Sequence, residues 1–135
     1  MSDELILRIL RQTKTIAVVG LSSRRERAGY YVPAYLQRQG YRIIPINPHL
    51  AEALEETAYP DLAAVPEPID LVLIFRQSEA VPPFVSEAIR LGAKAVWLQL
   101  GIVHTGAAAE AEVAGLGVVM DRCMLVEHRR LQAEI

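Results

Sequence analysis

The sequence predicts an α/β fold: a three-layer, doubly wound and mainly parallel sheet of five or six strands. Two observations predict it. Continuous runs of β-branched and other apolar residues, such as 15–20, 41–46 and 70–75, are typical of strands buried on both faces. Segments with helical spacing of apolar residues separate these runs up to the end of the chain. Sheets of this kind bind ligands beyond the carboxyl ends of their strands.

The first half of the chain predicts a β-α-β unit behind an opening helix. Residues 3–12 place apolar side chains at helical spacing, and the first strand, 15–20, stops at a glycine. A helix over about 29–39 ends at Gly40, and the second strand, 41–46, is closed by an Asn-Pro turn. A parallel return through one helix implies a right-handed crossover.

Periodicity weakens between residues 49 and 68, where we expect a short edge strand at 57–60 and one helical turn at 61–66. After the strand at 70–75, Ser78 is expected to cap a helix that runs to Leu91. The remaining elements are a strand at 95–100, a helix at 107–114 capped by Thr105, a strand at 117–120 and a closing helix at 124–131.

Length, charge and cysteine content restrict the class of protein. The 135 residues suit a single domain, 1–135, and the formal net charge of -2 gives no broad electrostatic footprint for nucleic acid. Cys123 is the only cysteine, so no internal disulfide is possible and a reducing cytoplasm is expected. No apolar run approaches the roughly 18 residues of a membrane span, and acidic residues occupy the start, where a secretory signal carries basic ones.

The loop after the first strand is the main candidate binding site. A glycine at the carboxyl end of a strand lets backbone amides approach a phosphate closely. Hydroxyls and guanidinium groups follow that glycine, so the candidate residues are Gly20, Ser22, Ser23, Arg24, Arg25 and Arg27. This composition predicts a phosphate-binding loop, against the alternative of an ordinary turn with solvated arginines. It matches neither the three-glycine dinucleotide fingerprint nor a P-loop.

The end of the second strand bears on the choice of nucleotide. NAD sites usually place an acidic residue about 20 positions past the glycines, where it binds the ribose hydroxyls. This chain has Asn47, Pro48 and His49 there, which makes a redox dinucleotide the weaker candidate. An Asn-Pro pair is equally a common way to end a strand.

Two further loops reach the same edge of the predicted sheet. Phe75 and Arg76 end the third strand near the topological switch point, where the arginine can meet a phosphate and the phenyl ring can flank an adenine. Gln99 and Gly101 end the next strand and are expected to line the far end of the pocket.

Cys123 and His128 suggest a nucleophile and base, but we interpret the cysteine as a small buried apolar residue. Asp121 and Glu127 have no evident carboxylate partner and are expected to be solvated or to cap helices. No histidines stand at the spacing of zinc ligands.

Taken together, these segments resemble the small stand-alone CoA-binding proteins, whose fold is shared with the CoA-binding domain of succinyl-CoA synthetase α-subunits. The resemblance spans nearly the whole chain. It is carried by residues 19–23, 40–48, 75–76, 92–101 and 117–123.

The resemblance implies a Rossmann-like sheet, with six strands in the order 3-2-1-4-5-6, that binds coenzyme A. Gly20, Ser22 and Ser23 would contact the diphosphate, while Asn47 and Pro48 would border the adenosine. By the same resemblance, the switch-point wall would be formed by Phe75 and Arg76, and the pantetheine end by Gln99 and Gly101.

The chain departs from the family pattern in two loops. The family usually has proline and serine where this chain has 24–29, and a glycine after the second strand that is missing from 49–59. The further domains and phosphorylated histidine of the synthetases have no counterpart here, so the resemblance implies binding without turnover.

The sequence therefore predicts non-covalent binding of coenzyme A or an acyl-CoA by a carrier, sensor or partner module without catalysis of its own. The alternatives are a small NAD(P)-dependent oxidoreductase and a CoA-thioester-processing enzyme that uses Cys123. A third possibility is a mixed disulfide between Cys123 and the CoA thiol.

Overall fold

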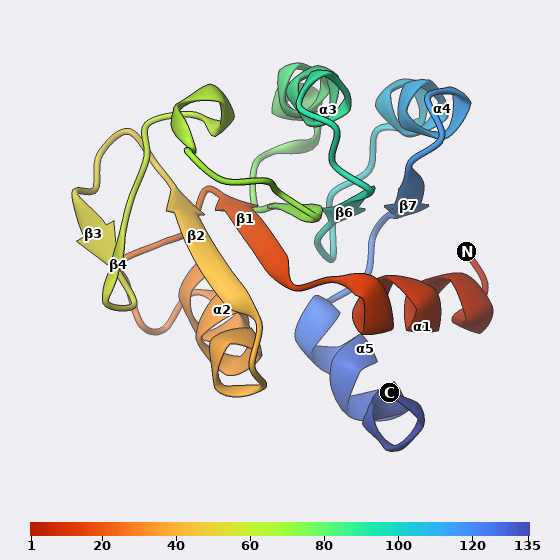
Figure 1. Cartoon of the computed structure of the whole chain (residues 1–135), viewed down its shortest axis with the longest axis horizontal. Coiled ribbons are helices and arrows are strands. Elements are labelled where there is room, and N and C mark those ends of the chain that lie inside the picture. Colours follow the sequence, from red (N-terminus) through yellow and green to blue (C-terminus); the bar gives the residue numbers. More distant parts are fainter.

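A five-stranded parallel sheet forms the middle layer of the computed structural model, which describes residues 1–135 (Figure 1). The strand order is β2-β1-β5-β6-β7, and every neighbouring pair is parallel. The strands are β1 (Thr15–Val19), β2 (Arg42–Ile46), β5 (Leu71–Ile74), β6 (Ala95–Leu98) and β7 (Gly117–Val119). The predicted fold class is confirmed, and each predicted strand of this sheet is present with ends within two residues.

The six-strand order implied by the resemblance is wrong at the edge next to β2. There the sheet is continued only by an isolated parallel bridge between Ile46 and Tyr59. The chain before that bridge turns back on itself as a small antiparallel hairpin of β3 (Glu52–Ala53) and β4 (Glu56–Thr57). The expected edge strand at 57–60 is therefore reduced to a bridge.

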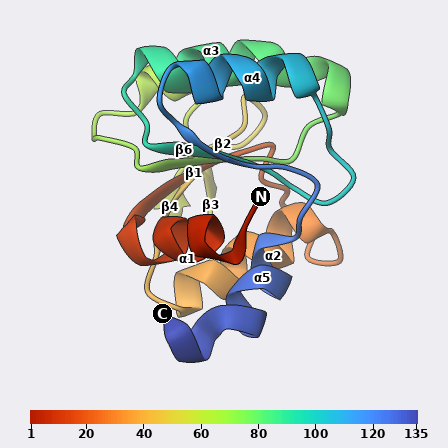
Figure 2. The ribbon, with the colours of Figure 1, turned by 90° about the vertical axis from the view of Figure 1, so that its right-hand side faces the viewer.

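Helices cover both faces of the sheet, as Figure 2 shows. Two of them, α3 (Val81–Arg90) and α4 (Thr105–Val113), lie on one face. The opposite face carries α1 (Asp3–Gln12), α2 (Ala28–Arg38) and α5 (Met124–Leu131). None of these helices has the length and apolar character needed to cross a membrane.

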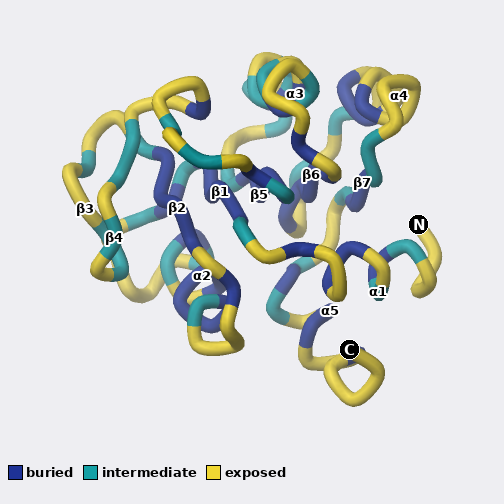
Figure 3. Tube along the Cα trace, in the orientation of Figure 1, coloured by how far each residue is buried: buried dark blue, intermediate teal, exposed yellow.

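The sheet separates two apolar cores, and alternate residues of each strand face opposite cores. In β1, Ile16 and Val18 pack with α1, α2 and α5, whereas Ala17 and Val19 pack with α3 and α4. All four are buried, so the strand has no polar side and appears as a continuous apolar run (Figure 3). This explains why the strands could be identified from sequence.

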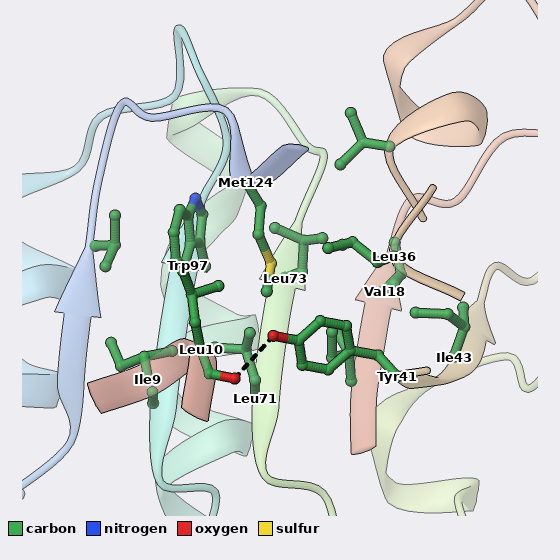
Figure 4. Close-up of a cluster of buried hydrophobic side chains, with 14 of the residues drawn as sticks. Ile9, Leu10, Val18, Leu36, Tyr41, Ile43, Leu71, Leu73, Trp97 and Met124 are labelled. Carbon is green, nitrogen blue, oxygen red and sulfur yellow. Dashed lines mark hydrogen bonds between the residues drawn. The ribbon is translucent and has the colours of Figure 1, made fainter. Parts of the chain in front are cut away.

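The core between the sheet and the layer of α1, α2 and α5 is called the lower core, and that layer the lower layer. The lower core contains Trp97, which is fully buried (Figure 4). Its indole Nε1 donates to the carbonyl oxygen of Arg122 at 2.8 Å. In the same core the Tyr41 hydroxyl donates to the carbonyl oxygen of Leu10 at 2.7 Å, which ties α1 to the start of β2. Burial raises the pKa of Tyr41 to about 12.

Both predicted helix caps are wrong. Ser78 belongs to a 3-10 turn (Ser78–Ala80) before α3, and its hydroxyl accepts from the amide of Val103 at 3.0 Å. His104, not Thr105, caps α4, because its Nδ1 accepts from the amide of Ala107 at 3.0 Å. Ser78 therefore joins the loops that follow β5 and β6.

Candidate functional site

The loop between β1 and α2 forms one wall of a cavity of about 590 Å³ at the carboxyl edge of the sheet. Segments that follow β2 and β5 form the opposite wall. Seven of the predicted site residues line this first cavity: Gly20, Ser22, Ser23, Arg24, Arg27, Asn47 and Phe75. The structure thus brings together side chains that come from three loops far apart in the sequence.

Two glycines allow the loop to fold tightly. Gly20 has φ +82, and a Cβ there would lie 2.5 Å from the carbonyl oxygen of Phe75. A Cβ on Gly29 would lie 3.2 Å from the carbonyl oxygen of Gly20. Only glycine permits both the left-handed backbone at the end of β1 and its close approach to β5.

Two amides in the first turn of α2 are left as free donors at the first cavity. The side chain of Arg27 gives no hydrogen bond to the start of α2, and the amides of Ala28 and Gly29 donate to no group of the protein. The Ser22 amide is not among them, because it donates to the carbonyl oxygen of Gly29 at 3.0 Å. Free first-turn amides and the positive end of the helix dipole favour an anion here.

The three arginines of the loop differ in their surroundings. Arg24 is exposed and pairs with Glu26 at 3.1 Å, whereas Arg27 has no carboxylate partner. Arg25 lies outside the cavity lining, and its guanidinium carbon is 6.0 Å from the centre of the Tyr30 ring. Arg27 is therefore the loop cation most available to a ligand in the first cavity.

Asn47 holds the two walls of the first cavity in place. Its Nδ2 donates to the carbonyl oxygen of Leu21 at 2.9 Å, and its Oδ1 accepts from the amide of His49 at 2.8 Å. Its own amide donates to the carbonyl oxygen of Tyr59 at 2.9 Å. The side-chain amide thus positions the loops, in addition to ending the strand.

A second cavity of about 400 Å³ adjoins the first and shares Gly20, Asn47, His49 and Phe75 with it. Its remaining lining is mostly apolar, with one cation: Val19, Ile46, Pro48, Pro60, Arg76 and Phe84. His49, Leu50, Pro60 and Phe84 were not predicted as site residues. For His49 a signal existed, because it directly follows the predicted Asn47 and Pro48.

Neither cavity has an aspartate or glutamate in its lining. The charged residues that line the two cavities are Arg24, Arg27 and Arg76, together with the titratable His49. Apolar surface in the second cavity and cations in both suit a ligand with a flat apolar group and several negative charges.

Gln99 and Gly101, predicted at the pantetheine end, lie outside the lining of both cavities. The side chain of Gln99 is buried, and its Oε1 accepts from the amide of Met124 at 3.2 Å. The amide of Gly101 donates to Oδ1 of Asp121 at 2.7 Å. In this structure both residues join the loop after β6 to the segment that leads into α5.

Cys123 and His128 do not form a nucleophile and base in this structure. Cys123 is half-buried against the lower core at the start of α5. His128 is buried between Tyr35 and Tyr41, and its Nδ1 lies 2.7 Å from the Tyr35 hydroxyl. Burial lowers the pKa of His128 and so favours the neutral ring.

The expectation that Glu127 is solvated or caps a helix is wrong. Only 5% of the residue is exposed, and its carboxylate pairs with Arg122 at 3.3 Å and with Arg130. Arg130 also binds Asp3 at 2.9 Å, which joins α5 to α1. These residues stabilise the lower layer and lie outside both cavities.

Comparisons with known proteins show which proteins this chain is similar to. Residues 14–129 match the family model described as a CoA binding domain. The chain is 41% identical over 123 residues, 91% of each chain, to the uncharacterized protein YneT of Bacillus subtilis. It is 30% identical over 108 residues to an ADP-forming acetate–CoA ligase of Archaeoglobus fulgidus, covering 78% of this chain but 16% of that protein.

Solved structures show the same fold. A hypothetical protein from Pyrococcus horikoshii OT3 superposes with a TM-score of 0.94 at 39% identity, over 98% of this chain and 93% of that one. A protein from Thermus thermophilus gives a TM-score of 0.91 at 41% identity, over 97% of this chain and 99% of that one.

Proposed function

This chain belongs to the family of CoA-binding domains, and from that premise we propose that it binds coenzyme A or an acyl-CoA non-covalently, as a carrier, sensor or partner module without catalysis of its own. The observation that carries the proposal is the pair of adjoining cavities with arginines and free amides but no carboxylate in their lining.

The residues present fit the chemical groups of coenzyme A. The diphosphate would occupy the first cavity, against the amides of Ala28 and Gly29 and the guanidinium group of Arg27. The adenine would occupy the second cavity, beside Phe75 and Pro48. Gly20 stands between the two cavities, where any side chain would meet the backbone of Phe75.

The same lining disfavours NAD. A carboxylate at the end of β2 would bind the ribose hydroxyls of NAD, and this position holds Asn47, whose side-chain amide is already used by the backbone of Leu21 and His49. Coenzyme A has more phosphate charge than NAD and therefore gains more from an acid-free, arginine-lined site.

Isothermal titration calorimetry with coenzyme A, acetyl-CoA, NAD and ATP tests the proposal. We expect saturable binding of the two CoA compounds and at least tenfold weaker binding of NAD. Arg27→Gln should weaken CoA binding about 10- to 100-fold, the value of a charge-assisted hydrogen bond. Arg38→Gln, an exposed arginine of the same helix outside both cavities, should leave affinity unchanged.

Two results would contradict the proposal. One is the absence of CoA binding by folded protein at concentrations of a few hundred micromolar. The other is preferential binding of NAD, which would instead support the oxidoreductase alternative.

A further inference from the structure

Arg76 is an arginine without a carboxylate partner at the centre of the sheet's carboxyl edge. It follows the central strand β5, next to β1, and takes part in none of the eight ion pairs of the chain. Its charge is not needed to balance a protein group.

The Arg76 side chain is exposed, and it lies close to β1 and to α3. Its Cδ lies 3.2 Å from the point that a Cβ on Gly20 would occupy, so the stem crosses the end of β1. Its guanidinium carbon lies 5.6 Å from the centre of the Phe84 ring on α3. A guanidinium group beside an aromatic ring and without a carboxylate partner is available to bind an anion.

Arg76 and Arg27 serve different cavities. Arg27 lines only the first cavity and Arg76 only the second, while Gly20, Asn47 and His49 belong to both. A ligand that crosses this shared rim would meet one unpaired guanidinium in each cavity. The arrangement therefore suits a ligand with two separate anionic groups rather than a single diphosphate.

Coenzyme A has two such groups: the diphosphate on the ribose 5′ carbon and a monophosphate on the 3′ carbon. We infer that Arg76 binds the 3′-phosphate and makes the protein selective for coenzyme A over its dephospho form. This inference rests on the proposed function. A phosphate monoester has a charge near -2 at neutral pH and matches the fork of a guanidinium group.

Titrations of coenzyme A and dephospho-CoA into the wild type, Arg76→Gln and Arg27→Gln test the assignment. We expect the wild type to prefer coenzyme A about 10- to 100-fold. Arg76→Gln should lose most of this preference by weakening coenzyme A alone. Arg27→Gln should weaken both ligands by a similar factor and keep the preference. Arg76→Lys, which retains the charge without the fork, should show an intermediate preference.

Thermal unfolding checks that each variant is folded; because Arg76 is exposed, its midpoint should stay within about 2 °C of the wild type. Equal affinity of the wild type for both ligands, or equal weakening of both by Arg76→Gln, would overturn the assignment while the proposed function stands. Failure of the wild type to bind either ligand would instead overturn the proposed function, and this inference with it.

Discussion

Two regions of this protein use arginines in opposite ways. Around the two cavities at the carboxyl edge of the sheet, Arg27 and Arg76 have no acidic partner. In the α5 corner, which we define as Asp3, Arg122, Glu127 and Arg130, every charged side chain is paired. The comparison shows which charges the fold uses for its own stability and which it leaves available for a ligand.

The α5 corner joins the two ends of the chain. Arg130 binds Glu127 on its own helix and Asp3 on α1, and the Glu127 side chain is only 6% exposed. A buried carboxylate requires such partners because its desolvation is otherwise costly. The cavity arginines are exposed, so water solvates them until a ligand replaces it. Substitutions in the two regions should therefore affect different properties.

The largest effect is expected from Gly20→Ala, at the junction of the two cavities. The substitution adds left-handed strain and a Cβ that is 2.5 Å from the Phe75 carbonyl oxygen. We expect the free energy of unfolding to fall by about 2–5 kcal/mol, as measured by urea denaturation. CoA binding should be lost even at temperatures where the variant stays folded, because both cavities share this residue.

Gly40→Ala is the matched control for Gly20→Ala. Gly40 has φ +102 but nothing within 4 Å of its Cβ position. Gly40→Ala should therefore lower the free energy of unfolding only by the left-handed strain, about 1–2 kcal/mol, and leave CoA affinity unchanged. Equal destabilisation by the two substitutions would mean that the contact with Phe75 relaxes freely.

Glu127→Gln should destabilise the protein without affecting CoA binding. The substitution removes the charge that Arg122 and Arg130 share, and hydrogen bonds to charged groups contribute about 1.5–3 kcal/mol each. Urea denaturation measures the loss, and calorimetry with CoA should give wild-type affinity. Glu87→Gln is the control, because the Glu87–Arg90 pair is on the surface and should contribute little to stability. A drop in CoA affinity for Glu127→Gln would mean that the two regions are coupled.

Sequence reasoning succeeded where a residue's role depends on its near neighbours. The buried strands follow from local apolar runs, and Gly20 follows from its place at the end of the first of them. It failed where the partner is distant in the sequence. The acceptor role of Gln99 toward Met124 and the burial of Glu127 against Arg122 depend on how α5 packs, which no local pattern records.

The wrong caps and the missing sixth strand have a local cause. At the start of α4 two polar residues are adjacent, and sequence does not show which one has the extended backbone that a cap requires; His104 has it and Thr105 does not. Before α3 a 3-10 turn intervenes, so the residue that precedes the helix is Ala80 and no side chain caps it. Before Tyr59, Leu54 and Glu55 adopt left-handed conformations that close a hairpin. Glycine usually marks such turns, and none is present here.

Asn47→Ala should affect both stability and CoA binding. It removes the hydrogen bonds to the backbone of Leu21 and His49, which together contribute about 1–2 kcal/mol. We also expect CoA affinity to fall about tenfold, because the two cavity walls are no longer held in register. Calorimetry and urea denaturation measure the two effects. Unchanged affinity would show that the loops keep their positions without this side chain.

The smallest effect concerns the pH dependence contributed by His128. Burial lowers its pKa below the ordinary value of 6.5, so below that pH the unfolded chain takes up a proton that the folded chain resists. Stability from this residue is therefore fully present above about pH 6.5 and falls as the pH drops toward the lower folded value, by at most about 1.4 kcal/mol per pH unit.

Urea denaturation between about pH 7 and pH 5 measures this slope, and His128→Gln should flatten it. Asp70 does not interfere in this range: burial would raise its pKa, but hydrogen bonds from the amides of Thr15 and Lys14 outweigh that effect and hold it below 3.8. The same slope in the wild type and His128→Gln would show that the buried imidazole is not the group that titrates, and that the lower layer is insensitive to its charge.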